Sequence, residues 1–205
     1  MIQLATGTGT KRNLAAMTGA GWGLLLTPDR PEMRPGFSCY AIDNGAWGCH
    51  QRGVEWEPSK WLALVDRWGA GAEWAVLPDV VMGGAASLAR SVGWLPQVVG
   101  KCPRWLIAVQ DGMTDADLAP YLSPSVGVFV GGSTEWKEQS LPMWGRACRA
   151  AGAWLHVGRV NSARRIRLCA MAGADSIDGT SGTRFAKTVP KLDFAVRQSA
   201  LVGIA

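Results

Sequence analysis

The stretch that decides the fold is GADSIDGTSGTR, residues 173–184. A short apolar run, predicted to be a buried strand, ends at Asp178, and a loop of Gly, Ser and Thr then leads to Arg184. A strand that delivers a carboxylate into a glycine-rich loop is a common way for a barrel to present a catalytic group. Asp before Gly is also ordinary turn chemistry, so this stretch alone leaves a purely structural role for Asp178 open.

Short apolar runs alternate with helical segments along the whole chain. Continuous apolar strands separated by helices favour a parallel sheet covered on both faces, and eight such units match a compact α/β (β/α)8 barrel (TIM barrel). An open doubly wound sheet is the alternative. The predicted strands are residues 2–6, 22–27, 38–43, 73–79, 105–110, 126–132, 154–158 and 175–178, and the predicted helices are residues 14–17, 58–68, 85–94, 115–122, 141–151, 162–172 and 192–201.

The composition is that of a folded domain. The chain has 205 residues, of which 48% are hydrophobic, and this suits one domain over residues 1–205. No apolar run reaches the roughly 18 residues of a membrane helix, and the N-terminus lacks the pattern of a secretion signal. We therefore expect a cytoplasmic protein with no membrane partner. The five cysteines and two histidines lack metal-site spacing, so no metal is expected.

Polar residues close several of the predicted strands. Asp43, Asp79 and Asp178 supply carboxylates, Gln110 supplies a carboxamide, and Gly131-Gly132 exposes backbone groups. In a barrel these strand ends meet at one mouth. Carboxylate and carboxamide groups can read the edge of a planar heterocycle, and two carboxyls roughly 5 Å apart suit double displacement at a sugar carbon.

A Ser-His-Asp triad is not expected, because no Gly-x-Ser-x-Gly motif occurs and both histidines, His50 and His156, look poorly placed.

Positive charge is concentrated toward the C-terminus. The net charge is +5, and from Lys137 onward there are 11 Lys and Arg against 4 Asp and Glu. This excess suits a polyanion, although a solvated helix face would give the same pattern. Candidate phosphate contacts are Lys11, Arg12, Arg159, Arg164, Arg165, Arg184 and Lys187.

Across most of the chain, short motifs resemble those of the tRNA-guanine transglycosylases, in the same order. YAIDNGAW (40–47) resembles the family's Asp-Ser-Gly-Gly-Phe segment, AVQDG (108–112) its Val-Gln-Gly-Gly, and FVGGS (129–133) its Ile-Gly-Gly-Leu. Residues 173–184 match Gly-x-Asp-x-Phe-Asp-x-x-x-Pro-Thr-Arg at equal spacing, with Gly182 in place of the proline.

The resemblance implies a role for each matched position. It implies that Asp178 is the nucleophile and Asp43 the general acid/base. Trp47 or Phe185 could stack on a base, although core packing is the commoner role for such side chains. The implied substrate-binding residues are Asp79, Gln110, Gly131, Gly132 and Ser133.

The family's zinc module, Cys-x-Cys-x-x-Cys…His, does not follow the last motif in residues 185–205. The chain is therefore more similar to the short phage-type members without the zinc-binding subdomain, which exchange guanine in DNA for a 7-deazaguanine. This resemblance implies DNA and a free base such as 7-cyano-7-deazaguanine as partners, no cofactor, and a homodimer or partner protein as an option. The alternatives are tRNA as the polymer, a hydrolase using the same carboxylates, and a non-catalytic barrel that binds nucleic acid or a purine.

Overall fold

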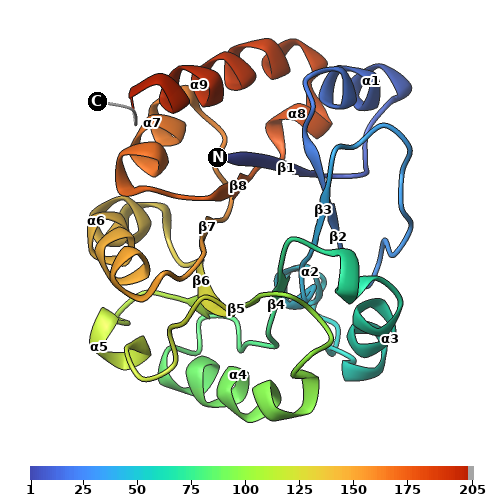
Figure 1. The fold of residues 1–205 in the computed structure, drawn as a ribbon. Coiled ribbons are helices and arrows are strands. Elements are labelled where there is room, and N and C mark those ends of the chain that lie inside the picture. The colour runs from blue at the N-terminus through green and yellow to red at the C-terminus, as the bar shows by residue number, and fades with distance from the viewer. Residues whose placement is uncertain (203–205) are drawn as a thin grey trace.

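The computed structural model describes residues 1–202, with side chains described through residue 198. Its eight strands form a closed barrel in sequence order, and every neighbouring pair is parallel, including β1 with β8 (Figure 1). The (β/α)8 prediction is therefore confirmed, and the open-sheet alternative is wrong. The strands are β1 (Ile2–Thr6), β2 (Gly23–Leu26), β3 (Tyr40–Ile42), β4 (Ala75–Val76), β5 (Trp105–Val109), β6 (Val126–Val130), β7 (Leu155–Val157) and β8 (Ser176–Asp178).

Helices surround the strands on the outside (Figure 1). They are α1 (Lys11–Gly19), α2 (Ala46–Arg52), α3 (Pro58–Trp68), α4 (Ala85–Val98), α5 (Asp115–Leu118), α6 (Thr134–Ala151), α7 (Ala163–Ala172), α8 (Ser181–Arg184) and α9 (Val189–Val202), with short 3₁₀ turns η1 (Gly69–Gly71) and η2 (Ala186–Thr188). None of the described helices combines the length and the apolar character needed to cross a bilayer.

The chain completes eight units in few residues because some connections are reduced. Residues 27–39 link β2 to β3 without a helix, and α5 has only 4 residues. Two short helices, α2 and α8, were not predicted. Both occupy glycine-containing segments just after strands, where the sequence indicates loops.

Helix α6 begins earlier than predicted and continues through Pro142. The Ser133 side chain caps it by accepting a hydrogen bond from the Trp136 backbone. Leu141 and Trp144 are buried on either side of the proline, so tertiary packing holds the helix together where local propensity would end it.

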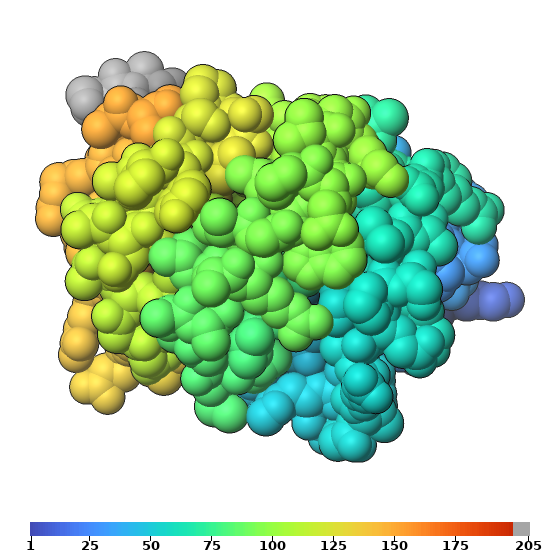
Figure 2. Space-filling view, turned by 90° about the horizontal axis from the view of Figure 1, so that it is seen from below, coloured from blue at the N-terminus to red at the C-terminus, as the bar shows by residue number. Residues whose placement is uncertain are grey.

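Two apolar cores fill the molecule. The larger one lies between the strands and the helices, and Figure 2 shows the outer surface over α4, where helix side chains cover the strands. The smaller one fills the barrel interior and contains Leu4, Leu25, Ala41, Trp74, Val76, Leu106 and Ala108.

Side chains alternate between the two faces of a strand, so the inner core determines which residues point into the mouth. Ala41 and Ala108 lie in the inner core. Asp43 and Gln110 are two positions further along the same segments and share that direction. Asp178 is likewise two positions after Ser176, which bonds to the inner-core side chain of Trp74. The strand ends therefore present these polar groups to a common mouth.

Candidate active site at the carboxyl end of the barrel

Asp43 follows β3, and its Oδ1 accepts a hydrogen bond from the Gly45 backbone N–H at 2.6 Å. Burial raises the pKa of Asp43 from 3.8 to about 7. The Gly45 hydrogen bond lowers this pKa, whereas the negative charges of Asp178 and Asp79 raise it. Asp43 can therefore carry a proton near neutral pH and exchange it, as a general acid/base must.

Asp79, after β4, belongs to a hydrogen-bonded network with Asn44 and Gln110. The Asn44 Nδ2 donates to Asp79 Oδ1 at 2.8 Å, and the Gln110 Nε2 donates to Asp79 Oδ2 at 2.9 Å. Burial raises the pKa of Asp79, and these two hydrogen bonds oppose that rise. In this structure the buried Gln110 amide holds Asp79 in place, so the two predicted base-binding side chains form one polar wall.

Asp178 ends β8, and both of its oxygens have partners. Its Oδ1 accepts from the Arg159 backbone N–H at 3.2 Å, and its Oδ2 lies 3.0 Å from the His156 Nε2. Arg159 adopts φ 60°, a left-handed conformation that is uncommon for a residue other than glycine. Both carboxylate oxygens of Asp178 are therefore held in place by neighbouring residues.

His156 is a candidate site residue that the sequence did not reveal. It is fully buried, and its Nδ1 lies 2.8 Å from the Ser176 Oγ. The expectation that both histidines are poorly placed is thus wrong for His156, because β7 and β8 pair it directly with Ser176. Inward-facing positions on neighbouring strands are the signal that could have located it. Ser176 is fully buried, so this Ser-His-Asp chain does not place a serine nucleophile at the mouth.

The side chain of Arg159 reaches across the mouth from the β7 side to the β3 side. Its guanidinium lies 4.7 Å from the centre of the Trp47 ring, and it donates a hydrogen bond to the Gly132 carbonyl. Trp47 is 41% exposed and Phe185 is 55% exposed, so neither serves as core packing. Trp47 thus offers a partly exposed aromatic ring, which packs against Arg159 and His50.

The Gly131-Gly132 segment follows β6, and Gly132 has a φ of 71°. A Cβ atom at Gly132 would collide with the Asp111 carboxylate, so glycine is required there. The Ser133 hydroxyl donates to Asp111 Oδ1 at 2.5 Å while it caps α6. The Ser133 side chain is therefore engaged within the protein, and its implied role in binding a base is not evident in this structure.

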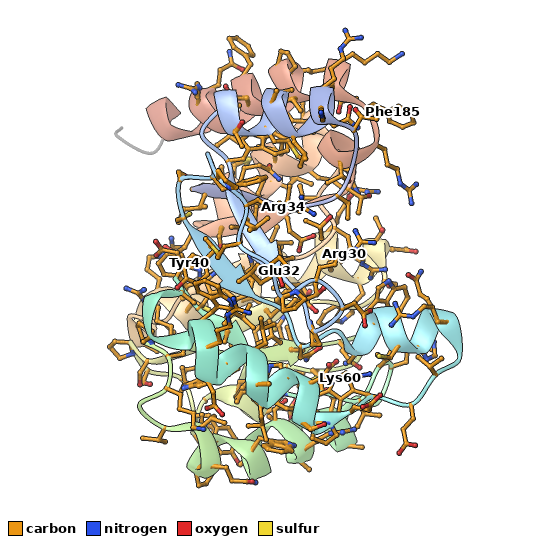
Figure 3. The ribbon with its side chains drawn as sticks, turned by 90° about the vertical axis from the view of Figure 1, so that its right-hand side faces the viewer. Arg30, Glu32, Arg34, Tyr40, Lys60 and Phe185 are labelled. Carbon is orange, nitrogen blue, oxygen red and sulfur yellow. The ribbon has the colours of Figure 1, made fainter. Side chains whose placement is uncertain are left out.

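Four of the predicted phosphate contacts form one exposed group, here called the basic patch: Lys11, Arg12, Arg184 and Lys187. Asn13 links α1, which carries Lys11 and Arg12, to the segment that carries Arg184 and Lys187. The Asn13 Nδ2 donates to the Thr183 carbonyl at 2.6 Å, and the Ala186 backbone N–H donates to Asn13 Oδ1 at 3.2 Å. Phe185 projects beside the patch, near α1 (Figure 3).

The other predicted phosphate contacts have partners within the chain. Arg164 and Arg165 both bind Glu138 on α6, at 2.7 and 3.1 Å. These hydrogen bonds lower the pKa of Glu138 to about 2, so the carboxylate stays ionised. A phosphate would have to compete with Glu138 for both arginines.

A cavity of about 430 Å³ lies beside the mouth, between the β2–β3 connection and α2. Asn44, Gly45 and Trp56 line it, and the Trp56 indole donates to the Asn44 carbonyl at 2.7 Å. Lys60, labelled in Figure 3, also lines this cavity, whereas Asp43 and Asp178 do not. Among the described residues, no group of three or more His, Cys, Asp or Glu side chains is placed to hold a metal ion.

Solved structures of similar fold include two of tryptophan synthase. No family model matches the chain, and no curated protein matches it in sequence. The first structure is a tryptophan synthase from M. tuberculosis in an aminoacrylate- and BRD0059-bound form, with 14% identity, a TM-score of 0.49, and coverage of 97% of this chain and 91% of that one. The second is the open form of tryptophan synthase from M. tuberculosis with BRD0059 bound, with 15% identity, a TM-score of 0.48, and coverage of 98% and 92%. At these values neither match bears on the chemistry of the site.

The raised pKa of Asp43 predicts a specific pH dependence of stability. Below pH 3.8 this carboxyl is protonated in both the folded and the unfolded state. Between 3.8 and about 7 only the unfolded chain ionises it, so the folded state loses stability as pH rises. Relative to Asp43→Asn, we expect wild type to lose on the order of 4 kcal/mol between pH 4 and pH 8 in urea unfolding. Asp43→Ala should give the same trend, and a difference that does not vary with pH would contradict the assignment.

Proposed function

We propose that this protein is a pentosyltransferase that exchanges guanine in DNA for a free 7-deazaguanine base through an aspartyl-deoxyribosyl intermediate. The observation that supports the proposal is that Asp43 and Asp178, at the same mouth of the barrel, have different surroundings. Asp178 accepts two hydrogen bonds, whereas burial raises the pKa of Asp43 to about 7. A carboxyl whose pKa is raised toward neutrality, near a second carboxyl held by hydrogen bonds, is typical of a general acid/base and its nucleophile.

The proposed reaction has two balanced displacements. An oxygen of Asp178 gives an electron pair to C1′ of the deoxyribose, the glycosidic C–N bond breaks, and Asp43 gives its proton to the departing guanine. The incoming base then attacks C1′, Asp43 accepts the proton that this base loses, and the ester electrons return to Asp178. One glycosidic bond replaces another, so the exchange balances without a redox partner or ATP.

The base must leave the DNA helix to reach this site, because C1′ of a stacked nucleotide is inaccessible to Asp178. The wall formed by Asp79 and Gln110 and the backbone of Gly131-Gly132 would then face the base, and Trp47 would supply a stacking surface. The Arg159 guanidinium lies over Trp47 in this structure, so a bound base would displace it. The freed arginine is then available to the DNA backbone.

The central test is the exchange itself. Labelled guanine, or 7-cyano-7-deazaguanine detected by nucleoside mass spectrometry, is incubated with the protein and duplex DNA, single-stranded DNA or tRNA. We expect incorporation into DNA, a loss of at least about 1,000-fold in Asp178→Asn and of about 100- to 10,000-fold in Asp43→Asn. The control Asp66→Asn, on the exposed end of α3, should retain wild-type activity.

Each other outcome contradicts the proposal in a distinct way. Incorporation into tRNA alone makes RNA the polymer. Release of guanine without replacement indicates a hydrolase, and DNA binding without release or exchange indicates a non-catalytic barrel.

The basic patch predicts the salt dependence of DNA binding. If Arg184 and Lys187 each neutralise a phosphate, alanine at either position should weaken binding and reduce the slope of log K against log salt by about 1. Lys101→Ala is the matched control, because Lys101 precedes β5 at the opposite end of the barrel and pairs with Asp66. Titrations by fluorescence anisotropy at several salt concentrations measure the slopes. Equal slopes for Arg184→Ala, Lys101→Ala and wild type would exclude the patch from the interface.

A further inference from the structure

The hydroxyl of Ser176 has its hydrogen-bonding roles fixed by its neighbours. Ser176 is fully buried, and its Oγ lies 3.1 Å from the indole nitrogen of Trp74 and 2.9 Å from that of Trp154. An indole N–H can only donate, and a hydroxyl oxygen has two lone pairs. Both lone pairs are therefore occupied. The single hydroxyl hydrogen is left for the third neighbour, the His156 Nδ1, at 2.8 Å.

This arrangement determines where His156 carries its proton. Burial lowers the pKa of His156, and the hydrogen bond with Asp178 opposes that effect only in part, so the ring is neutral. A neutral imidazole whose Nδ1 accepts from Ser176 must carry its hydrogen on Nε2. The Nε2 then donates to Asp178 Oδ2, at 3.0 Å. The two indoles thus fix the direction of the Ser176 hydroxyl, and this hydroxyl in turn fixes His156 as a donor to Asp178.

The surroundings of His156 leave the ring little room to turn. The Trp74 ring centre lies 4.5 Å from the imidazole centre, and the Phe129 ring centre lies 4.7 Å from it. A Cβ atom on Gly158 would lie 3.0 Å from the Phe129 ring and 3.4 Å from Asp178 Oδ2. Because Gly158 has no Cβ, the Phe129 ring and the Asp178 carboxylate can pack closely against its backbone. Two aromatic rings, whose own centres lie 6.1 Å apart, therefore pack against the imidazole.

The charged groups that act on His156 are Asp178 on β8 and Lys137 on α6. The buried Lys137 ammonium donates to the Gly158 carbonyl at 2.6 Å, and burial lowers the pKa of Lys137 to about 8. Its positive charge further disfavours a protonated imidazole. Burial and the charge of Lys137 thus both favour the neutral form of His156, whereas Asp178 favours the protonated form.

We propose that His156 is a positioning residue that donates its Nε2–H to Asp178 Oδ2, leaving Oδ1 as the oxygen that attacks the substrate. Oδ2 faces the buried ring, whereas Oδ1 accepts from the Arg159 backbone at the carboxyl end of the barrel. When Oδ1 forms the ester with C1′, Oδ2 becomes the carbonyl oxygen and keeps its hydrogen bond. When the ester breaks, negative charge returns to the carboxylate and this bond strengthens. The attack on C1′ rests on the proposed function, but the tautomer does not.

The first test reads the tautomer directly. Long-range ¹H–¹⁵N spectra of protein labelled with ¹⁵N-histidine contain signals from only two rings, and His50→Gln identifies those of His156. We expect the Nε2–H tautomer in wild type near neutral pH. In Ser176→Ala the fixed donor to Nδ1 is lost, and the shifts should move toward a mixture of tautomers. A wild-type ring that is protonated on Nδ1 would overturn the proposal.

The second test reads the effect on catalysis. His156→Gln keeps an N–H donor near the position of Nε2, whereas His156→Leu removes it. We expect kcat for base exchange to fall by about 100-fold in His156→Leu with KM unchanged, and to fall much less in His156→Gln. Equal kcat in wild type and His156→Leu would overturn the role.

The two tests separate the positioning role from the proposed function. A wild-type protein that shows the Nε2–H tautomer but exchanges no base would refute the transglycosylase proposal and leave the hydrogen-bond assignment standing. If His156→Leu does not fold, Ser176→Ala still decides the question: its spectrum tests the tautomer, and its kcat should fall below that of wild type because the fixed donor to Nδ1 is lost.

Discussion

The alternation of side chains along parallel strands in a closed barrel is the constraint on which the site depends. Ala41 and Ala108 face the barrel interior. Asp43 and Gln110 lie two residues further along the same segments, so they face the same way at the mouth. The pairing of β1 with β8 closes the barrel and brings Asp178 to the same mouth. A one-residue slip in any of these strands would turn the polar group toward the helices instead.

The barrel interior also gives two similar carboxyls different properties. Asp43 has a backbone donor at Gly45, but burial and two neighbouring negative charges favour its protonated form. Asp178 receives hydrogen bonds from the Arg159 backbone and from His156. In the proposed reaction, this difference in burial and hydrogen bonding assigns the acid to Asp43 and the nucleophile to Asp178.

The fold was predictable because each apolar run is bounded by turn residues, and all eight predicted strands are present, although β4 covers only Ala75–Val76 of the predicted residues 73–79. The glycine-containing segments that form α2 and α8 were not, because tertiary packing overrides their weak local preference. Strand-end carboxylates identified Asp43, Asp79 and Asp178 as site candidates. His156 escaped detection because its role depends on register with Ser176 and on the two indoles that occupy the serine oxygen, which only the three-dimensional pairing reveals.

The measurement that most directly tests the central claim is isolation of the covalent intermediate. Protein mixed with guanine-containing DNA is quenched in acid, digested, and analysed by mass spectrometry for a peptide carrying deoxyribose-linked DNA. The account predicts this adduct on the peptide containing Asp178, with more of it when no free base is supplied and none in Asp178→Asn. An adduct on another residue, or base exchange that proceeds at the wild-type rate in Asp178→Asn, would contradict it.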